Sequence, residues 1–299
     1  MNNKVIIIYG PTAVGKSAIA IELAKQINGE IISADSMQIY KHLTIGTAKV
    51  TEDEMCGIKH HMIDFVEPGG EFSVAEFCEM AKKSVRDIQE KNKTPIIVGG
   101  TGLYIKALTE GYNFAEYGRN ERFRECIESL SNDELYAKII DINPEIKVDK
   151  NNKRRLVRTL EKLTFGGETK AQYCEFDYIL FVIKDDRDKI YTRINNRVDK
   201  MVDLGILDEL KYLLSLNLKE DDLCMKAIGY KEFLPYINGE CSLKECEELL
   251  KQKTRNYAKR QFTFMNQFKD KICVEFDGIE NTAKKIKEII DNNGIAWFY

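Results

Sequence analysis

The residues with the clearest capacity for chemistry form a glycine-rich loop near the start of the sequence. The loop follows an apolar run, Val5–Tyr9, and precedes a segment of helical character, Ala18–Ile27. A strand, a glycine loop and a helix in this order are the setting of a P-loop, where backbone N–H groups and the helix N-terminus attract a phosphate. The loop consists of Gly10, Pro11, Thr12, Ala13, Val14, Gly15, Lys16 and Ser17.

Two side chains of this loop extend the prediction. Lys16 supplies a full positive charge, and the Ser17 hydroxyl is suited to ligate Mg²⁺. The alternative is a glycine-rich turn with an incidental lysine, and the flanking strand and helix argue against it. The loop therefore predicts a site for a diphosphate or polyphosphate, with Mg²⁺ as the cofactor, but it does not tell what happens to the phosphate.

Two further polar residues follow segments of strand character. Asp35 lies in Glu30–Tyr40, which we expect to be a short strand ending in a polar elbow, and Thr101 stands in the glycine turn Gly99–Gly102. The carboxyl ends of parallel strands surround the ligand crevice of an open α/β sheet, so Asp35 should lie near the P-loop, and Thr101 could hydrogen-bond a substrate from its turn. Asp35 could instead be a turn or N-cap aspartate, and Thr101 could be a helix cap.

The partner acid of a typical nucleotide-hydrolysing P-loop is missing. Such proteins hold Mg²⁺ with an aspartate at the end of a second strand, whereas here the strand Ile96–Val98 ends in two glycines and Asp35 comes too early. The loop is therefore stronger evidence for phosphate binding than for ATP. If the phosphate is a leaving group, the loop and Mg²⁺ would stabilise departing diphosphate while Asp35 acts on the acceptor nucleophile.

The order of the elements around these residues predicts an α/β fold. Strand and helix characters alternate before Asn113, and short apolar runs without alternation are typical of parallel strands buried on both faces. A charged helical stretch then interrupts the pattern until the strand Tyr178–Ile183. We predict a P-loop NTPase-like parallel sheet with flanking helices from residues 1–112 and 177–299, and a small helical insertion at 113–176.

Local signals place individual elements. Ser73 and Glu76 form a capping-box pattern that predicts the start of a helix. Lys59–Phe65 has the character of a strand or a strand edge. Gly205 is expected to end a helix whose core stripe begins at Ile190.

Two basic clusters, at 153–158 and on a helix expected over 249–268, suggest a nucleic-acid surface. The net charge of the chain is −3, so a nucleic acid would be held by a local patch and not by a global field. We infer that the clusters lack compensating acids, and aromatic residues interleave with the second; an ordinary solvated face is the alternative. Their basic residues include Arg154, Arg155, Arg158, Arg255 and Lys259.

Composition excludes several classes of protein. The eight cysteines never form a Cys-x-x-Cys pair, which fits neither a zinc site nor a secreted disulfide scaffold and indicates free thiols in a reducing cytoplasm. Adjacent His60 and His61 would point to opposite sides of a strand and make a poor metal site. We find neither a signal region nor a stretch of membrane-spanning length, and expect a cytoplasmic protein without membrane contact.

Taken together and in order, the motifs of this sequence resemble those of the tRNA dimethylallyltransferases. The resemblance covers nearly the whole chain and is far more specific than the P-loop alone. It departs from the family pattern in the insertion, at 149–152 and 165–168. The matching segments are 10–17, Ile32–Tyr40, Ile45–Lys49, His60–Asp64, Val98–Tyr104, Arg154–Arg158, Arg193–Met201, Ala227–Lys231 and Thr254–Gln261.

The resemblance implies a reaction and a set of catalytic residues. A dimethylallyl group would pass from dimethylallyl diphosphate to N6 of adenosine 37 of tRNA, giving N6-isopentenyladenosine and diphosphate. Thr12–Ser17 would hold the diphosphate with Mg²⁺, and Arg197 would lie near it. Asp35 would be the general base, and Thr101 would contact the adenosine. Family members flip this base into a channel that meets the donor from the other side.

The resemblance also implies contacts to the anticodon stem-loop of the tRNA. The insertion would fold over this arm, and we expect the enzyme to be a monomer. The implied tRNA-binding residues are Asp35, Ser36, Met37, Gln38, Thr101, Arg124, Arg154, Arg155, Arg158, Arg255 and Lys259.

Three other functions remain open at the level of sequence. A free adenine-nucleotide isopentenyltransferase would use the same chemistry, although the insertion and the basic helix favour RNA. A P-loop kinase for a small metabolite would consume ATP and ignore tRNA. A non-catalytic RNA-binding protein would use a nucleotide as a switch and form no prenyl product.

Overall fold

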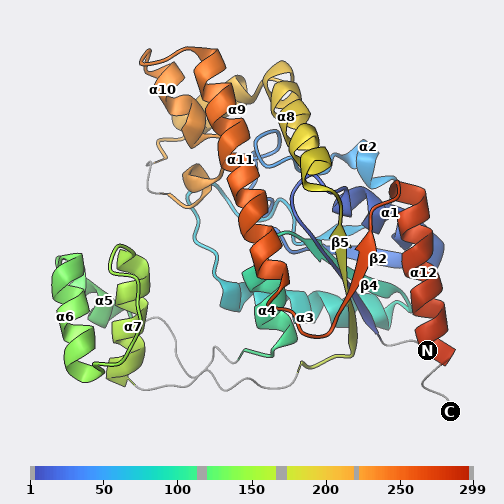
Figure 1. The fold of residues 1–299 in the computed structure, drawn as a ribbon, viewed down its shortest axis with the longest axis horizontal. Coiled ribbons are helices and arrows are strands. Elements are labelled where there is room, and N and C mark those ends of the chain that lie inside the picture. Colours follow the sequence, from blue (N-terminus) through green and yellow to red (C-terminus); the bar gives the residue numbers. More distant parts are fainter. Residues whose placement is uncertain (1–3, 113–119, 166–173, 219–221, 296–299) are drawn as a thin grey trace. The chain divides into compact units, whose positions relative to one another are not determined.

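The computed structural model describes residues 4–112, 120–165, 174–218 and 222–295 (Figure 1). The chain divides into two compact units. The first, called here the α/β unit, comprises Met1–Thr109 and Cys174–Tyr299, and the second, the helical unit, comprises Glu110–Tyr173. Residues 113–119 and 166–173 of the predicted insertion lie outside the described residues.

A six-stranded sheet with the order β3-β2-β4-β1-β5-β6 forms the centre of the α/β unit. Every pair of neighbouring strands in this sheet is parallel. β1 lies between β4 and β5 and is buried over its whole length, as its run of aliphatic residues predicts. The strands are β1 (Val5–Tyr9), β2 (Gly29–Ser33), β3 (His60–His61), β4 (Thr94–Gly99), β5 (Tyr178–Lys184) and β6 (Lys271–Glu275).

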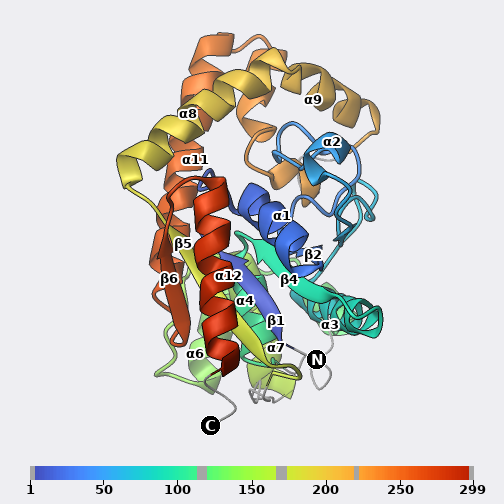
Figure 2. The same cartoon turned by 90° about the vertical axis from the view of Figure 1, so that its right-hand side faces the viewer.

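Helices cover the sheet and rise above the carboxyl ends of its strands. α12 packs on α1 beside the sheet, and α8 and α11 extend above the strand ends (Figure 2). Short 3₁₀ turns occur at Cys224–Lys226 and Lys231–Phe233. The helices of this unit are α1 (Lys16–Ile27), α2 (Glu52–Met55), α3 (Val74–Glu90), α4 (Gly102–Thr109), α8 (Arg187–Asp203), α9 (Ile206–Ser215), α10 (Leu234–Ile237), α11 (Leu243–Met265) and α12 (Ile279–Ile295).

In the described part of the helical unit, three helices surround a small core. Buried aliphatic side chains such as Leu135, Ile139 and Leu156 fill this core. The helices are α5 (Glu121–Ile127), α6 (Asn132–Ile142) and α7 (Lys153–Phe165).

Among the described residues, two hydrophobic clusters stabilise the α/β unit. One joins the sheet to α1 and α12, and the other lies under α8, α9 and α11. The second cluster includes Ile39, Tyr40 and Leu43, which follow β2. It therefore holds the segment after Asp35 against helices that come some 150 residues or more later in the chain.

Several local predictions can be compared with the structure. The capping box of Ser73 and Glu76 is confirmed at the start of α3. α11 begins earlier than expected because Ser242 and Glu245 form a second capping box. None of the helices in the described parts of the chain combines the length and the apolar character needed to cross a membrane.

Two further local predictions have different outcomes. Of the segment expected at 59–65, only β3 is a strand, because Met62 and Asp64 adopt positive φ values of 61° and 55° and break the extended backbone. The prediction that Gly205 ends a helix is confirmed, because α8 ends at Asp203 and Gly205, with a φ of 94°, makes the left-handed turn into α9.

Candidate active site

The P-loop joins β1 to α1 as predicted. Ala13 and Gly15 have φ values of 62° and 95°, so the loop turns its backbone tightly before α1 begins. A side chain at Gly15 would also meet the ring of Phe276 at 3.2 Å. Within the loop, Lys16 Nζ donates a hydrogen bond to the Pro11 carbonyl oxygen at 2.7 Å.

α8 supplies two arginines to this loop. Arg197 donates to the Thr12 hydroxyl at 3.2 Å, and Arg193 Nε donates to the Ala13 carbonyl oxygen at 2.9 Å. Arg193 is also paired with Asp185, at the end of β5. The sequence predicts Arg197 near the diphosphate site, whereas it gives no such role to Arg193, four residues earlier on α8.

Positive charge is concentrated beside the loop. Burial, reinforced by Arg197 and opposed by Asp35, lowers the pKa of Lys16 to about 7. Burial also lowers the pKa of Arg197, with Glu54 opposing the shift and Arg193 adding to it. Two cations whose charged forms are disfavoured by their surroundings make a site that an anion would stabilise.

Asp35 and Thr101 are brought together where β2 and β4 end. Thr101 Oγ1 accepts a hydrogen bond from Ser36 N at 3.1 Å, and Thr101 N donates to the Ala34 carbonyl oxygen at 3.3 Å. This approach requires Gly99, because an added Cβ would lie 2.1 Å from the Ala34 carbonyl oxygen. The Thr101 hydroxyl therefore ties two strand ends together instead of capping α4.

The carboxylate of Asp35 has a fixed orientation. Its Oδ1 accepts a hydrogen bond from Met37 N at 2.9 Å, which is the turn arrangement considered as the alternative to a chemical role. The residue nevertheless remains partly exposed and lines a cavity. The turn hydrogen bond and a catalytic role are therefore compatible.

Two adjoining cavities meet at Asp35. The first, of about 710 Å³, is lined by the P-loop, including Lys16 and Ser17. The second, of about 320 Å³, is lined by residues of α11 and by Lys226 and Lys231. Both cavities are lined by Asp35, together with Thr12, Thr47, Ala48, Arg197 and Met201.

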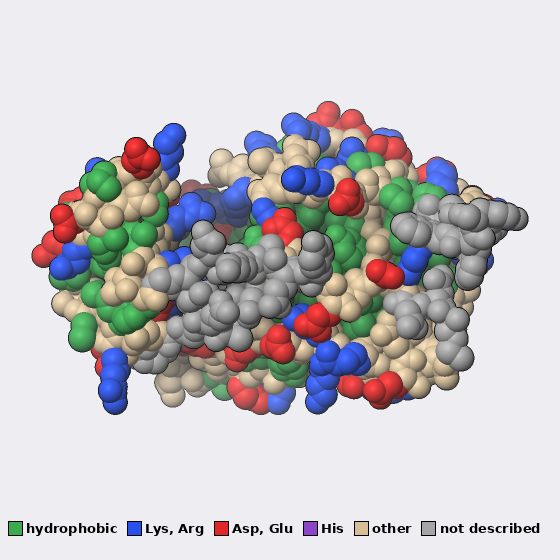
Figure 3. Space-filling model, turned by 90° about the horizontal axis from the view of Figure 1, so that it is seen from below, with side chains coloured by type: hydrophobic (Ala, Val, Ile, Leu, Met, Phe, Trp, Pro, Cys, Tyr) green, Lys and Arg blue, Asp and Glu red, His purple; other side chains and the backbone are tan. Residues whose placement is uncertain are grey.

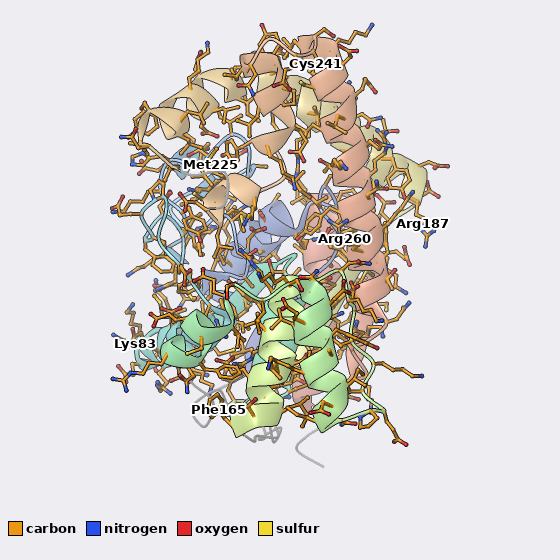
Figure 4. All side chains as sticks on the ribbon, turned by 90° about the vertical axis from the view of Figure 1, so that its left-hand side faces the viewer. Lys83, Phe165, Arg187, Met225, Cys241 and Arg260 are labelled. Atoms are coloured by element: carbon orange, nitrogen blue, oxygen red, sulfur yellow. The ribbon has the colours of Figure 1, made fainter. Side chains whose placement is uncertain are left out.

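The second cavity has an aromatic and basic lining. Arg260, which projects from α11 (Figure 4), lies over the ring of Tyr257 at 5.4 Å, and both line this cavity. Burial and the nearby Asp35 raise the pKa of Tyr257, although hydrogen bonds from Thr101 and Gln261 oppose the shift. Tyr257 is therefore a neutral phenol beside Asp35 and Thr101.

The loop over residues 44–49 contributes Thr47 and Ala48 to the lining of both cavities. The Glu209 carboxylate accepts hydrogen bonds from the backbone N–H groups of Thr44, Ile45 and Gly46 at 2.9, 2.9 and 3.0 Å. It also accepts one from the Tyr230 hydroxyl at 2.7 Å. One half-buried carboxylate thus fixes the loop to α9.

The residues predicted to touch RNA near the site fall into two groups. Ser36 and Met37 line the second cavity, whereas Gln38 lines the first and donates to the carbonyl oxygens of Thr47 and Ala48, both at 3.3 Å. On α11, Lys259 is exposed. Arg255, on the same helix, donates to Asn195 Oδ1 at 2.6 Å.

In the helical unit, two of the predicted RNA-binding arginines have another partner. The buried Glu161 carboxylate accepts hydrogen bonds from Arg124 NH2 at 2.8 Å and Arg158 NH1 at 2.9 Å. Arg154 and Arg155 are exposed on α7. The inference that the basic clusters lack compensating acids is therefore wrong for Arg158.

The inference that the basic clusters lack compensating acids is also wrong for Lys251, in the cluster on α11. Lys251 is paired with Asp199 at 2.7 Å and with Glu248 at 2.9 Å. On the face seen in Figure 3, basic and acidic side chains are likewise interspersed, which is typical of a solvated surface. Charge counting along the sequence overstated how much of the basic surface is unneutralised.

Comparison with known proteins identifies the family. The profile of the IPP transferase family matches residues 38–268. A tRNA dimethylallyltransferase from Anoxybacillus flavithermus is 43% identical, over 97% of this chain and 96% of its own length. One from Lactococcus lactis is 46% identical, over 93% of each chain. This chain belongs to the tRNA dimethylallyltransferase family.

Solved structures of tRNA dimethylallyltransferases and isopentenyltransferases share the fold. The tRNA isopentenylpyrophosphate transferase from Bacillus halodurans has a TM-score of 0.76 and 35% identity, over 100% of both chains. A eukaryotic dimethylallyltransferase acting on tRNA has a TM-score of 0.84 and 30% identity, over 98% of this chain and 79% of its own. The predicted P-loop NTPase-like fold, the family resemblance and the assignment as a prenyl-transferring enzyme are confirmed.

Sequence reasoning missed several residues that line the site or hold it in place. Tyr257, Arg260 and Gln261 had no assigned role, although their spacing places them on one face of a helix. Glu209 and Arg193 gave no separate signal, because their importance comes from contacts with distant loops.

Proposed function

We propose that this chain transfers a dimethylallyl group from dimethylallyl diphosphate to N6 of adenosine 37 of tRNA. The observation that carries the proposal is the position of Asp35, which lines both the P-loop cavity and the cavity beside α11. A carboxylate at the junction of two cavities suits a reaction in which two substrates meet. The products are N6-isopentenyladenosine and diphosphate.

The P-loop cavity is the proposed donor site. As the C–O bond of the donor breaks, its electron pair and a growing negative charge move to the diphosphate. Burial and the nearby Arg197 lower the pKa of Lys16, burial and Arg193 lower the pKa of Arg197, and a bound diphosphate would oppose both shifts. Preorganised cations and the N-terminus of α1 therefore stabilise the leaving group.

Mg²⁺ is the proposed cofactor. The ion keeps several waters and takes one or two protein oxygens together with substrate phosphates. The Ser17 hydroxyl, in the first turn of α1 and on the wall of the first cavity, fits this role. Within the described residues there is no cluster of three or more His, Cys, Asp or Glu that could hold a metal alone. When bound, Mg²⁺ would neutralise charge on the diphosphate.

The second cavity is the proposed adenosine site. A flipped base would stack against Tyr257 and Arg260, whose planes suit an aromatic ligand. Asp35 accepts the N6 proton while the new C–N bond forms to the donor carbon. Thr101, which is hydrogen-bonded to Ser36 and Tyr257, is proposed to hold Tyr257 and the segment that carries Asp35 in place for the base.

The anticodon arm is proposed to lie on α11 and on the helical unit. Lys259 on α11 and Arg154 and Arg155 on α7 are exposed, and each is suited to a phosphate contact. Arg124 and Arg158, by contrast, already donate to Glu161 and are proposed to shape the helical unit. A tRNA substrate supports a cytoplasmic enzyme, and we propose that the enzyme acts as a monomer.

A transfer assay tests the proposal. Purified protein, Mg²⁺ and labelled dimethylallyl diphosphate should label a tRNA that carries adenosines at positions 36 and 37. Equal labelling of AMP would replace tRNA by a free nucleotide as acceptor. ATP turnover without any prenyl product would instead favour a small-metabolite kinase, and the absence of both reactions would favour a non-catalytic RNA-binding protein.

A further inference from the structure

Gln261 connects the two halves of the site through one side-chain amide. Its Oε1 accepts a hydrogen bond from Thr12 N in the P-loop at 2.8 Å, and its Nε2 donates to the Gly100 carbonyl oxygen at 2.9 Å. The side chain is buried, with only 4% of the residue exposed. A residue of α11 thus joins two loops that lie 249 and 161 positions away in the sequence.

The chemistry of these contacts fixes the orientation of the amide. A flipped amide would place its NH₂ group against the Thr12 N–H and its oxygen against the Gly100 carbonyl, so both contacts would become repulsive. The fit is also steric, because a Cβ added at Gly100 would lie 2.3 Å from Gln261 Nε2. The amide therefore fills the space that the glycine leaves.

Thr12 is held from two sides as a result. Its N–H is bonded to Gln261, and its hydroxyl accepts from Arg197 on α8. The Thr12 N–H is thus committed to the protein, and the remaining loop amides and cations are left to hold a phosphate. Gln261 also forms a side-chain hydrogen bond with the hydroxyl of Tyr257, which lines the second cavity.

We propose that Gln261 is a positioning residue that sets the separation between the diphosphate site and the edge formed by Asp35 and Thr101. This inference rests on the proposed function, because the separation matters only if two substrates react there. Gly100 immediately precedes Thr101, and Thr12 belongs to the donor loop. Reacting atoms must approach to about 3–3.5 Å, and a misplacement of about 1 Å can cost ~10²-fold in rate.

Gln261→Glu gives a test that a merely structural role would not pass. A protonated carboxyl group can accept from Thr12 N–H and donate to the Gly100 carbonyl, as the amide does, whereas a carboxylate cannot donate and brings negative charge to the diphosphate. Burial favours the protonated form. We expect the ratio of variant to unsubstituted kcat/KM to rise about 10-fold or more as the pH falls from about 8.5 to about 6.

Two other variants complete the design. Gln261→Met has a similar length but makes neither hydrogen bond, so its kcat/KM for dimethylallyl diphosphate should fall about 10–100-fold at every pH, with the Kd for tRNA unchanged. Gln252→Glu adds the same charge to an exposed position of α11. Its ratio of variant to unsubstituted kcat/KM should not change with pH. Circular dichroism and thermal unfolding check the fold of each variant.

The outcomes separate this inference from the proposed function. If the unsubstituted protein does not prenylate tRNA, the proposed function fails. If it does, but Gln261→Met keeps kcat/KM within about 3-fold or Gln261→Glu gives a ratio independent of pH, then the positioning role is refuted. Failure of both Gln261 variants to fold would assign the residue a structural role and overturn the inference as well.

Discussion

The P-loop region and the helical unit both contain buried or half-buried cations, but these cations donate to different kinds of acceptor. Lys16 and Arg197 donate to neutral oxygens, those of Pro11 and Thr12, and their pKa values are lowered. In the helical unit, arginines surround the buried carboxylate of Glu161.

The difference teaches how to recognise a ligand site among charged residues. A neutral oxygen satisfies a hydrogen bond but leaves the positive charge unbalanced, so an anion gains energy by binding there. A buried carboxylate balances the charge inside the protein and removes that driving force. Cations of the first kind are available to a diphosphate, and those of the second kind stabilise the fold.

The largest expected effect concerns the carboxylate of the P-loop region. Asp35→Asn should lower kcat by about 10²–10⁴-fold, the range for losing a general base, because the amide cannot take the N6 proton. Steady-state kinetics with tRNA and isothermal titration with inorganic diphosphate and Mg²⁺ measure the two properties separately. Diphosphate binding should survive. Equal loss of binding and turnover would make Asp35 a structural residue and weaken the contrast with Glu161.

The second prediction concerns Arg197, whose guanidinium donates to a neutral oxygen. Arg197→Gln should weaken dimethylallyl diphosphate binding and lower kcat/KM by about 10²-fold, because it removes a charge that faces the leaving group. The thermal midpoint should stay the same or rise, since the charged guanidinium is disfavoured by its burial. A marked fall in the midpoint without a change in kcat/KM would contradict the assignment.

The third prediction concerns Arg124 and Arg158, which are paired with the carboxylate of Glu161. Glu161→Gln should destabilise the helical unit by about 1–3 kcal/mol, because Arg124 and Arg158 lose a charged acceptor. Hydrogen exchange of the α7 amides reports this locally, and diphosphate affinity should not change. Arg154→Gln on the exposed face of the same helix serves as the control and should leave the exchange unaltered.

The pH dependence of the same carboxylate follows from its contacts. Burial opposes ionisation of Glu161, but hydrogen bonds from Arg124, Asn120 and Arg158 outweigh it and lower the pKa. Because the pKa is lower in the folded state, the stabilisation is complete above the ordinary glutamate pKa and is lost as the pH falls below it. Acid titration of α7 exchange in the unsubstituted protein should show this loss, and the Glu161→Gln protein should not.

A smaller effect is expected from the titration of Lys16. With a pKa of about 7 in the empty site, Lys16 loses its charge as the pH rises above that value. Donor affinity should therefore fall by up to about 10-fold per pH unit above neutrality, since a bound anion favours the protonated amine. Lys16→Met should bind more weakly and show a shallower dependence. Identical slopes in both proteins would rule out Lys16 as the titrating group.

The smallest effect concerns the exposed cations of α11. Lys259→Ala should weaken tRNA binding about 2–5-fold and reduce the slope of log K against log salt by about 1, as expected for one phosphate contact. Prenyl-donor affinity should be unaffected. A salt slope that does not change would show that Lys259 belongs to the solvated face and makes no contact with RNA.

The sequence predicted those parts of the site that depend on neighbouring residues. The P-loop, Asp35 and Thr101 follow buried strands directly, and parallel strands bring their ends together, so their proximity could be inferred. The capping box at Ser73 could be predicted for the same reason, because its two partners are three residues apart.

The remaining parts depend on partners far away in the chain. Nothing around Gln261 indicates that its amide bonds to Thr12, and nothing around Glu209 indicates that it collects the N–H groups of Thr44 to Gly46. Glu161 was overlooked because charges were counted within the basic run, and the acid lies one helical turn beyond it. Long-range hydrogen bonds and charge pairs are invisible to local patterns.

The contact between Gln261 and the P-loop has a consequence for how the enzyme is made. The ribosome synthesises the chain starting at its N-terminus. The P-loop and the strands β1 to β5 therefore emerge from the ribosome well before α11. Until α11 arrives, the Thr12 N–H and the Gly100 carbonyl lack their shared partner. Strands β1 to β5 can pair before α11 is made, but β6, which follows α11, and the active site are completed only near the end of synthesis.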